Sequence, residues 1–222
     1  MEKIIKIKSL NKITPDVLQV RGEKPADLVF VPGQAADISI NKEGWKEEKR
    51  PFTFTSLPDA DYIEFTIKTY PAHKGVTNQL LYLKAGDELI LHDVFGDIAY
   101  KGEGLFIAGG AGITPFLAIF RSLEAKGQIG DNQLIFANKT KADIIHEALF
   151  AQLLGKNFIN VLSDEKIEGY VNGYITEALL EDTLAGKNKK IYLCGPPPMM
   201  DVVEKMLSNL HINEANIIKE GF

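Results

Sequence analysis

The sequence contains a single cysteine, Cys194. One thiol cannot form an internal disulfide, and it cannot supply the four thiolates that hold a plant-type iron–sulfur cluster. His92, His146 and His211 also lack ligand-like spacing to acidic residues or to the cysteine. We therefore predict no metal site in this chain. Any iron–sulfur cluster that works with the protein must be bound by a partner protein.

Long apolar runs are also missing. The longest, residues 105–120, is interrupted by glycines and by Pro115, and it is shorter than the roughly 20 residues that span a membrane as a helix. Residues 1–8 alternate apolar and charged side chains, as a half-buried strand does, and lack the apolar region of a signal peptide. We expect no membrane insertion, no export signal and a cytoplasmic location.

The sequence also lacks a stretch of basic residues that could bind phosphates. The net charge is -5, and the lysines between residues 42 and 49 alternate with acidic residues, which is typical of a solvated surface. Nucleic acid is therefore not expected as a partner. With 222 residues, 45% of them hydrophobic, the chain is long enough for one large domain or two modest ones.

The first hundred residues read as short β segments separated by turn clusters, a pattern typical of an antiparallel barrel or sandwich. One helix, at residues 76–83, interrupts them after Gly75. The predicted strands cover residues 4–8, 17–21, 35–40, 52–56, 62–69 and 88–92.

The second half alternates apolar strands with helices, which predicts a parallel sheet covered by helices, with ligands beyond the carboxyl ends of the strands. Because residues 101–104 are polar and glycine-rich, we divide the chain into domains at 1–101 and 102–222. The predicted strands are residues 105–108, 133–137, 158–162 and 191–194, and the predicted helices are residues 114–125, 145–154, 175–184 and 198–209.

The segment Leu105–Pro115, with the sequence LFIAGGAGITP, is a buried strand that enters a glycine turn and then a helix. Glycines let the backbone approach a pyrophosphate, and a helix amino terminus offers free N–H groups to it. It differs from the Rossmann fingerprint, because Thr114 and Pro115 stand where the third glycine would be. The alternative interpretation is a tight strand-to-helix turn without a ligand.

The segment Ile191–Met200, with the sequence IYLCGPPPMM, repeats this strand–turn–helix order. Its prolines form a rigid wall at the carboxyl end of a strand, and Cys194 is the last strand residue, facing the crevice where a ligand would lie. A buried structural cysteine is the alternative.

The segment Arg50–Ser56, with the sequence RPFTFTS, combines an arginine for phosphate, aromatic rings for a flat ligand and hydroxyls for ring nitrogens. An amphipathic edge strand explains the same residues. Gly75–Leu80 is a helix start with a hydroxyl in its first turn, which favours an anion site.

Together, these four segments resemble the ferredoxin-NADP reductase superfamily over essentially the whole chain. That family has an Arg-x-Tyr-Ser flavin segment, a Gly-x-Ser/Thr-x-x-Leu phosphate-binding helix start, a Gly-x-Gly-Ile-x-Pro loop and a Cys-Gly-Pro-Pro loop. The end of the chain, Glu220–Phe222, is similar to the family's terminal Glu-x-aromatic. The resemblance implies an N-terminal antiparallel β-barrel that binds FAD and a C-terminal α/β domain with a parallel sheet that binds NADH or NADPH.

For the flavin, the resemblance implies that Arg50 holds the pyrophosphate, Phe52 and Phe222 cover the two faces of the ring, and Thr53 lies near its reactive nitrogen. The other flavin-binding residues implied by the resemblance are Pro51, Lys68, Gly75, Val76 and Thr77.

For the nicotinamide nucleotide, the resemblance implies that Cys194 and Glu220 shape the site of hydride transfer together with Thr53 and Phe222. The implied nucleotide contacts are Gly110, Gly112, Ile113, Thr114, Pro115, Lys139, Asp164, Cys194, Gly195, Pro196 and Met199. Asp164 stands where NADP-using members carry an arginine, which favours NADH because an acid repels the 2'-phosphate, whereas Lys139 favours NADPH.

Two departures keep an alternative open. Phe52 replaces the family's tyrosine and Thr53 its serine, so flavin binding is expected to be weaker.

The leading hypothesis is an NAD(P)H-dependent reductase that passes electrons singly to a small carrier such as ferredoxin or flavodoxin, as a monomer or weak dimer. The alternatives are a reductase that uses free flavin as substrate and a nucleotide-binding module without turnover.

Overall fold

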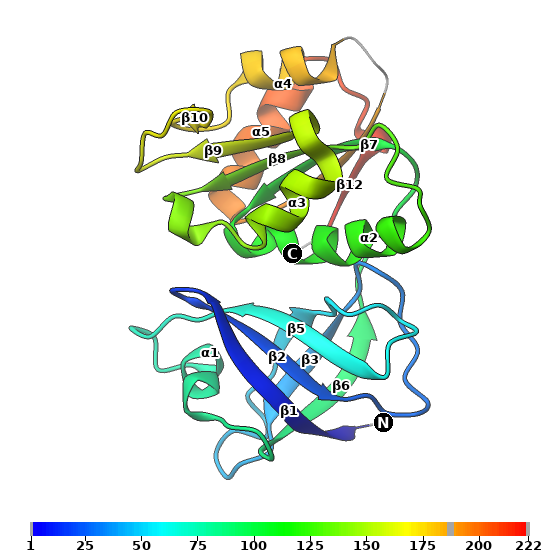
Figure 1. Ribbon diagram of the computed structural model, residues 1–222, viewed down its shortest axis with the longest axis vertical. Coiled ribbons are helices and arrows are strands. Elements are labelled where there is room, and N and C mark those ends of the chain that lie inside the picture. The colour runs from blue at the N-terminus through cyan, green and yellow to red at the C-terminus, as the bar shows by residue number, and fades with distance from the viewer. Residues whose placement is uncertain (1, 186–188, 221–222) are drawn as a thin grey trace.

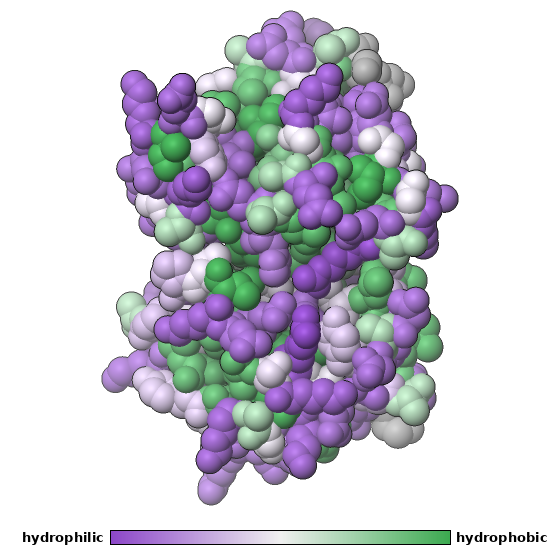
Figure 2. All heavy atoms as spheres, in the orientation of Figure 1, coloured by the Kyte–Doolittle hydropathy of each residue, from purple (hydrophilic) through white to green (hydrophobic). Residues whose placement is uncertain are grey.

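The computed structural model describes residues 2–185 and 189–220. Two six-stranded sheets divide the chain, one from its first half and one from its second, and they lie one above the other with α2 between them (Figure 1). Hydrophilic side chains cover much of the face seen in Figure 2, while apolar patches remain on both halves.

The first sheet is antiparallel throughout, in the order β4-β3-β6-β1-β2-β5. A bridge between Phe54, just after β4, and Phe65 of β5 joins the two edge strands, so the sheet closes on itself. The predicted antiparallel barrel is therefore confirmed. Its strands are β1 Lys3–Thr14, β2 Val17–Glu23, β3 Ala35–Ile40, β4 Arg50–Thr53, β5 Tyr62–Lys68 and β6 Glu88–Phe95.

The predicted helix at residues 76–83 is shorter than expected. It consists of α1, Val76–Gln79, followed by a 3-10 turn, Leu80–Tyr82. Val76 and Leu80 are both buried in the barrel core. This short helix covers one end of the barrel.

The second sheet is parallel, in the order β10-β9-β8-β7-β11-β12, which confirms the predicted α/β half. The short strands β10 and β12 were not anticipated from the sequence. The strands are β7 Gly104–Gly109, β8 Gln133–Asn138, β9 Phe158–Leu162, β10 Val171–Asn172, β11 Lys190–Cys194 and β12 Ile217–Lys219.

Helices cover both faces of this sheet. On one face, α2 (Thr114–Ala125) and α3 (Glu147–Leu154) pack over β7 and β8. On the other face, α4 (Glu177–Leu184) and α5 (Pro197–Asn209) pack over the alternate residues of the same strands. Since β6 ends at Phe95 and β7 begins at Gly104, we propose the domain boundary between residues 101 and 102.

Helix α2 is buried on nearly all sides. Pro115 occupies its first turn, where the missing N–H costs nothing, and residues 114–120 are all buried. Its apolar side chains share one cluster with Val17 and Ile98 from the first half of the chain. A helix with apolar side chains on most of its sides must be covered on most of them, and here the parallel sheet and the barrel cover it together.

A charged group crosses the same interface. The side chain of Glu64 in β5 is fully buried; its Oε2 lies 2.8 Å from Arg21 Nε, and its Oε1 lies 2.6 Å from Arg121 Nη1 of α2. Burial alone would raise the pKa of Glu64, but the charge of Arg121 and hydrogen bonds from Arg121, Arg21 and Thr55 lower it below its ordinary value. Glu64 is therefore held as a carboxylate.

Replacing Glu64 with glutamine leaves two arginines without their counter-charge. We expect Glu64→Gln to lower the free energy of unfolding by about 3 kcal/mol, because both arginines are partly exposed and the loss falls at the low end for a broken buried pair. The same change at exposed Glu23 in β2 is the matched control and should cost less than about 0.5 kcal/mol. Urea unfolding at neutral pH measures both.

The pH dependence of unfolding tests the same carboxylate. Because the folded pKa of Glu64 is depressed, its contribution to stability is fully present above the ordinary glutamate pKa and is lost as the pH falls through the folded value. The unmodified protein should therefore lose stability more steeply than Glu64→Gln below about pH 4.5. Parallel curves for the two proteins would contradict a depressed pKa at Glu64.

Candidate functional site

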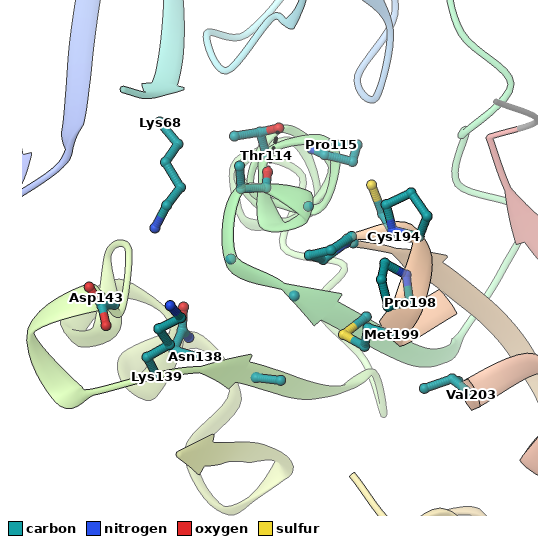
Figure 3. Close-up of a pocket in the computed structure, with 18 of the residues that line it drawn as sticks. Lys68, Thr114, Pro115, Asn138, Lys139, Asp143, Cys194, Pro198, Met199 and Val203 are labelled. Carbon is teal, nitrogen blue, oxygen red and sulfur yellow. Dashed lines mark hydrogen bonds between the residues drawn. The ribbon is translucent and has the colours of Figure 1, made fainter. Parts of the chain in front are cut away.

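A cavity of about 1010 Å³ lies between the barrel and the carboxyl ends of the parallel strands. Its lining includes Phe52 and Thr53 from the barrel side and Gly110 and Cys194 from the loops after β7 and β11. Ligand sites usually measure roughly 300–1,000 Å³, so this cavity is large enough for an extended ligand. It is lined by both halves of the chain, and Figure 3 shows Lys68 extending from the barrel towards Asn138 and Lys139.

The cavity lies at the topological switch point of the parallel sheet. Strands β7 and β11 are neighbours there, and the chain leaves β7 and β11 towards opposite faces of the sheet, which opens a crevice between the two loops. A side chain at Gly112 would overlap the carbonyl oxygen of Cys194, so glycine permits the two loops to touch. Gly110, with φ +51°, faces open space, which leaves its backbone accessible to a ligand.

On the barrel side, Pro51, Phe52 and Thr53 line the cavity at the end of β4. The next residue, Phe54, is fully buried in the barrel core and stacks on Phe30 with ring centroids 4.2 Å apart. Phe52 is only partly buried: it packs against the same core cluster and also lines the cavity.

Thr53 meets the other half of the chain directly. Thr114 Oγ1 lies 3.0 Å from the carbonyl oxygen of Ala111 and 3.2 Å from Thr53 Oγ1. A hydroxyl has one hydrogen to donate and the carbonyl oxygen can only accept, so either threonine can be the donor between Thr53 and Thr114. The barrel and the glycine loop are therefore joined at the wall of the cavity.

Cys194 and Glu220 lie together on the same wall. Burial, aided by the negative charge of Glu220, raises the pKa of the Cys194 thiol to about 12. Burial and the charge of Asp97 likewise raise the pKa of Glu220. Cys194 is therefore a neutral thiol at physiological pH, which excludes a thiolate nucleophile here.

The far end of the cavity is polar. Asn138, Lys139, Asp143 and Ser163, which follow or end β8 and β9, line it. The carboxylate of Asp143 already accepts hydrogen bonds from the backbone and hydroxyl of Thr140, at 2.9 and 2.8 Å, so it is held in place.

The structure brings most of the predicted site residues to this cavity. Those that line it are Pro51, Phe52, Thr53, Lys68, Thr77, Gly110, Gly112, Thr114, Pro115, Lys139, Cys194, Gly195, Pro196, Met199 and Glu220. Phe222 lies outside the described residues.

Five predicted residues do not line the cavity: Arg50, Gly75, Val76, Ile113 and Asp164. Val76 and Ile113 point into the two cores. Arg50 is exposed and pairs with Glu48 at 3.5 Å. Asp164 is exposed, and its carboxylate accepts a hydrogen bond from the hydroxyl of the preceding residue, Ser163, at 2.6 Å.

Several lining residues were not singled out from the sequence. A usable signal existed for Asn138 and Ser163, which end β8 or directly follow β9, since the carboxyl ends of parallel strands carry ligand contacts. Tyr174 and Val202 lie in a loop and on a helix, and nothing local marks them.

A second polar group has the serine–histidine–carboxylate sequence of contacts seen in hydrolase triads, but its serine is not accessible to a substrate. Ser39 Oγ lies 2.8 Å from His92 Nε2, and His92 Nδ1 lies 3.1 Å from Glu2. Ser39 is fully buried in the barrel and does not line the cavity, so no substrate reaches it. This group joins β3 to β6.

Within residues 2–185 and 189–220, no group of three or more His, Cys, Asp or Glu side chains is arranged to hold a metal ion. The same residues include no helix that is both long enough and apolar enough to cross a bilayer.

The cavity has features that fit a flavin and a dinucleotide. Phe52 offers a ring and Thr53 a hydroxyl at the junction of the two halves. Farther along the barrel, Thr77 and Lys68, whose Nζ also lies 2.7 Å from Asp16 Oδ2, have donor groups that suit a phosphate. Gly110 leaves open space where a pyrophosphate can approach the backbone.

Comparison with known protein families gives two matches. Residues 2–89 match the model of an FAD-binding domain, and residues 106–205 match that of an oxidoreductase NAD-binding domain. These ranges fall within the barrel half and the α/β half respectively.

The chain is similar to proteins that are named as reductases. The chain is 30% identical to NADH-cytochrome b5 reductase 1 of Aspergillus oryzae, over 96% of this chain and 80% of that protein. It is also 30% identical to the reductase component of propane 2-monooxygenase from Mycolicibacterium goodii, over 92% of this chain. The chain spans only 62% of the length of that component.

Solved structures share the fold. A ferredoxin NADP+ reductase from Neisseria gonorrhoeae with bound FAD and NADP superposes with a TM-score of 0.84 at 20% identity, covering 99% of this chain and 98% of that one. Together, the closed barrel, the switch-point cavity and these matches show that the chain belongs to the ferredoxin-NADP reductase superfamily of FAD- and NAD-binding oxidoreductases.

Proposed function

We propose that this chain is an NAD(P)H-dependent FAD reductase that delivers electrons to a separate carrier protein such as a ferredoxin or flavodoxin. The observation that carries the proposal is the contact between Thr53 and Thr114, which joins the barrel strand to the glycine loop in one cavity. When bound, FAD supplies the redox chemistry, since it takes both electrons of the nicotinamide and releases them one at a time.

The barrel residues would hold the flavin. Thr53 would offer its hydroxyl to the flavin, and Phe52 and Pro51 form the adjoining wall. Lys68 and Thr77 lie farther along the same wall, where Arg50, Gly75 and Val76 would complete a phosphate site once Arg50 leaves Glu48.

The α/β residues would hold the nucleotide against that wall. The loop of Gly110, Gly112 and Thr114 presents its backbone, and Cys194 to Pro196 and Met199 form the facing side. Cys194, a neutral thiol, and Glu220 exclude water from the junction and orient the ring. This places both reactants at one point, as hydride transfer requires.

We propose NADH as the donor. The supporting features are the acidic loop around Asp164, which is unfavourable for a 2'-phosphate, and the printed name of the NADH-cytochrome b5 reductase relative.

We propose that the acceptor is a small acidic electron carrier. Lys74 and Lys84 are exposed on either side of α1, and His73 stacks with Tyr70 beside the cavity, so this rim is basic. Relatives include the electron transfer components of 2-halobenzoate and toluate dioxygenases, which by name serve a partner. We further propose a cytoplasmic monomer or weak dimer.

The absorbance spectrum of the purified, dialysed protein tests this function. We expect flavin bands that bleach on anaerobic addition of NADH, more completely than with NADPH. Because Phe52 lacks the family's hydroxyl, the competing function is a reductase that uses free flavin as a substrate. A colourless protein that oxidises NADH only when flavin is supplied would establish that alternative, and a colourless inert protein would overturn both functions.

The loop around Asp164 gives a test of donor choice. Asp164→Arg should shift the ratio of kcat/KM for NADPH over NADH upward by about tenfold, which corresponds to about 1.4 kcal/mol, because an arginine attracts the 2'-phosphate. Glu168→Arg, an identical charge reversal at an exposed position of the same loop, is the control and should leave the ratio within about twofold. Equal shifts in both variants would remove Asp164 from donor selection.

A further inference from the structure

Helix α2 contacts the barrel at two polar points on one side. At its first residue, Thr114 reaches Thr53 across 3.2 Å. Farther along, Arg121 Nη1 donates to the carbonyl oxygen of Thr55 at 2.5 Å and to Glu64 Oε1 at 2.6 Å. At 1.5 Å per residue, these points are about 10 Å apart along the helix axis.

The two contact points on the barrel form one rigid piece. Thr53 and Thr55 lie two positions apart in the chain, and the Thr55 N–H donates to the Glu64 carbonyl oxygen at 2.7 Å. The Thr55 hydroxyl also lies 3.0 Å from Glu64 Oε1. A shift of Arg121 against Glu64 would therefore shift Thr114 against Thr53, and with it the glycine loop that precedes the helix.

We propose that Arg121 and Glu64 are a positioning pair that sets α2 on the barrel and so fixes the glycine loop relative to Thr53. The inference rests on the proposed function, because the pair would control the distance between the bound flavin and the nicotinamide. The apolar cluster around α2 favours burial without a preferred direction, whereas a guanidinium held by a carbonyl and a buried carboxylate has a defined geometry.

The structure supplies its own control. Arg21, in β2, contacts the same carboxylate from within the barrel, with Nε 2.8 Å from Glu64 Oε2. Removing Arg21 therefore weakens the charge balance of Glu64 without breaking a bond between the two halves of the chain. If Arg121 only stabilises the fold, its removal should affect the reaction rate as little as removal of Arg21 does. If Arg121 positions α2, only its removal should slow the reaction.

The kinetic test compares Arg121→Met with Arg21→Met in the FAD-loaded protein. Both should retain bound flavin and lose similar thermal stability. Arg121→Met should slow flavin reduction by saturating NADH by about 10- to 100-fold, the scale of a misplacement of about 1 Å, with an increased isotope effect for NADH deuterated at C4. Arg21→Met should stay within about twofold. Arg121→Lys, which keeps the charge but not the forked geometry, should recover part of the rate.

The second readout needs no turnover. Spin labels on Glu43→Cys and Glu181→Cys, two exposed positions in different halves, report the distance between the halves. Cys194 is 8% exposed and its pKa is about 12, so it should not compete for the label. The distance distribution should be narrow in the unmodified protein and in Arg21→Met, and broader or shifted in Arg121→Met and, to a lesser degree, in Arg121→Lys.

These outcomes separate the two proposals. If Arg121→Met matches Arg21→Met in rate, isotope effect and label distance, the pair is structural and the positioning role is overturned. If Arg121→Met does not fold, Arg121→Lys decides by the same criteria. A protein that neither binds flavin nor oxidises NADH would overturn the proposed function, and unchanged label distances in the arginine variants would separately overturn positioning.

Discussion

The arrangement of the molecule depends on one requirement, the burial of helix α2. Its apolar side chains need cover on the side of the parallel sheet and on the opposite side, and the barrel provides the second cover through Val17 and Ile98. Burial of this helix makes the two halves one packed body. The cost is that Arg121, the charged side chain of α2 that lies at the interface, must find a counter-charge there, and Glu64 supplies it.

The cavity follows from the same packing. With α2 pressed against the barrel, the loop before it is brought to the end of β4, and the neighbouring loop after β11 is held against it where Gly112 meets Cys194. Neither half encloses the cavity alone. The barrel lines it with an aromatic ring and hydroxyls, and the parallel-sheet half lines it with a glycine loop and a neutral thiol.

Local signals made the fold largely predictable. The bounds of α2, residues 114–125, followed from the glycine turn and Pro115, and β3 and β9 were likewise placed from their apolar runs. Closure of the barrel through Phe54 and Phe65 was not readable in detail, because it depends on which distant strands meet. The same holds for β12, whose three residues gain their pairing from β11.

The site was predictable to the level of segments, and less so to the level of side chains. Glycine and proline motifs identified the loops that line the cavity, but they did not indicate that Ser163 lines it while the neighbouring Asp164 does not. Arg121 was missed even though a charge that directly follows the apolar run of residues 115–120 in a helix is a signal, since burying it requires a partner. Glu64, in the apolar alternation of β5, carries the same signal.

The lengths of the outermost strands have a consequence for behaviour in a crowded solution. The barrel joins its own edges, and the parallel sheet ends in β10, with two residues, and β12, with three. Long open edges present rows of unpaired N–H and C=O groups that recruit strands from other copies. Such short borders give the strands of a second copy few backbone groups to pair with.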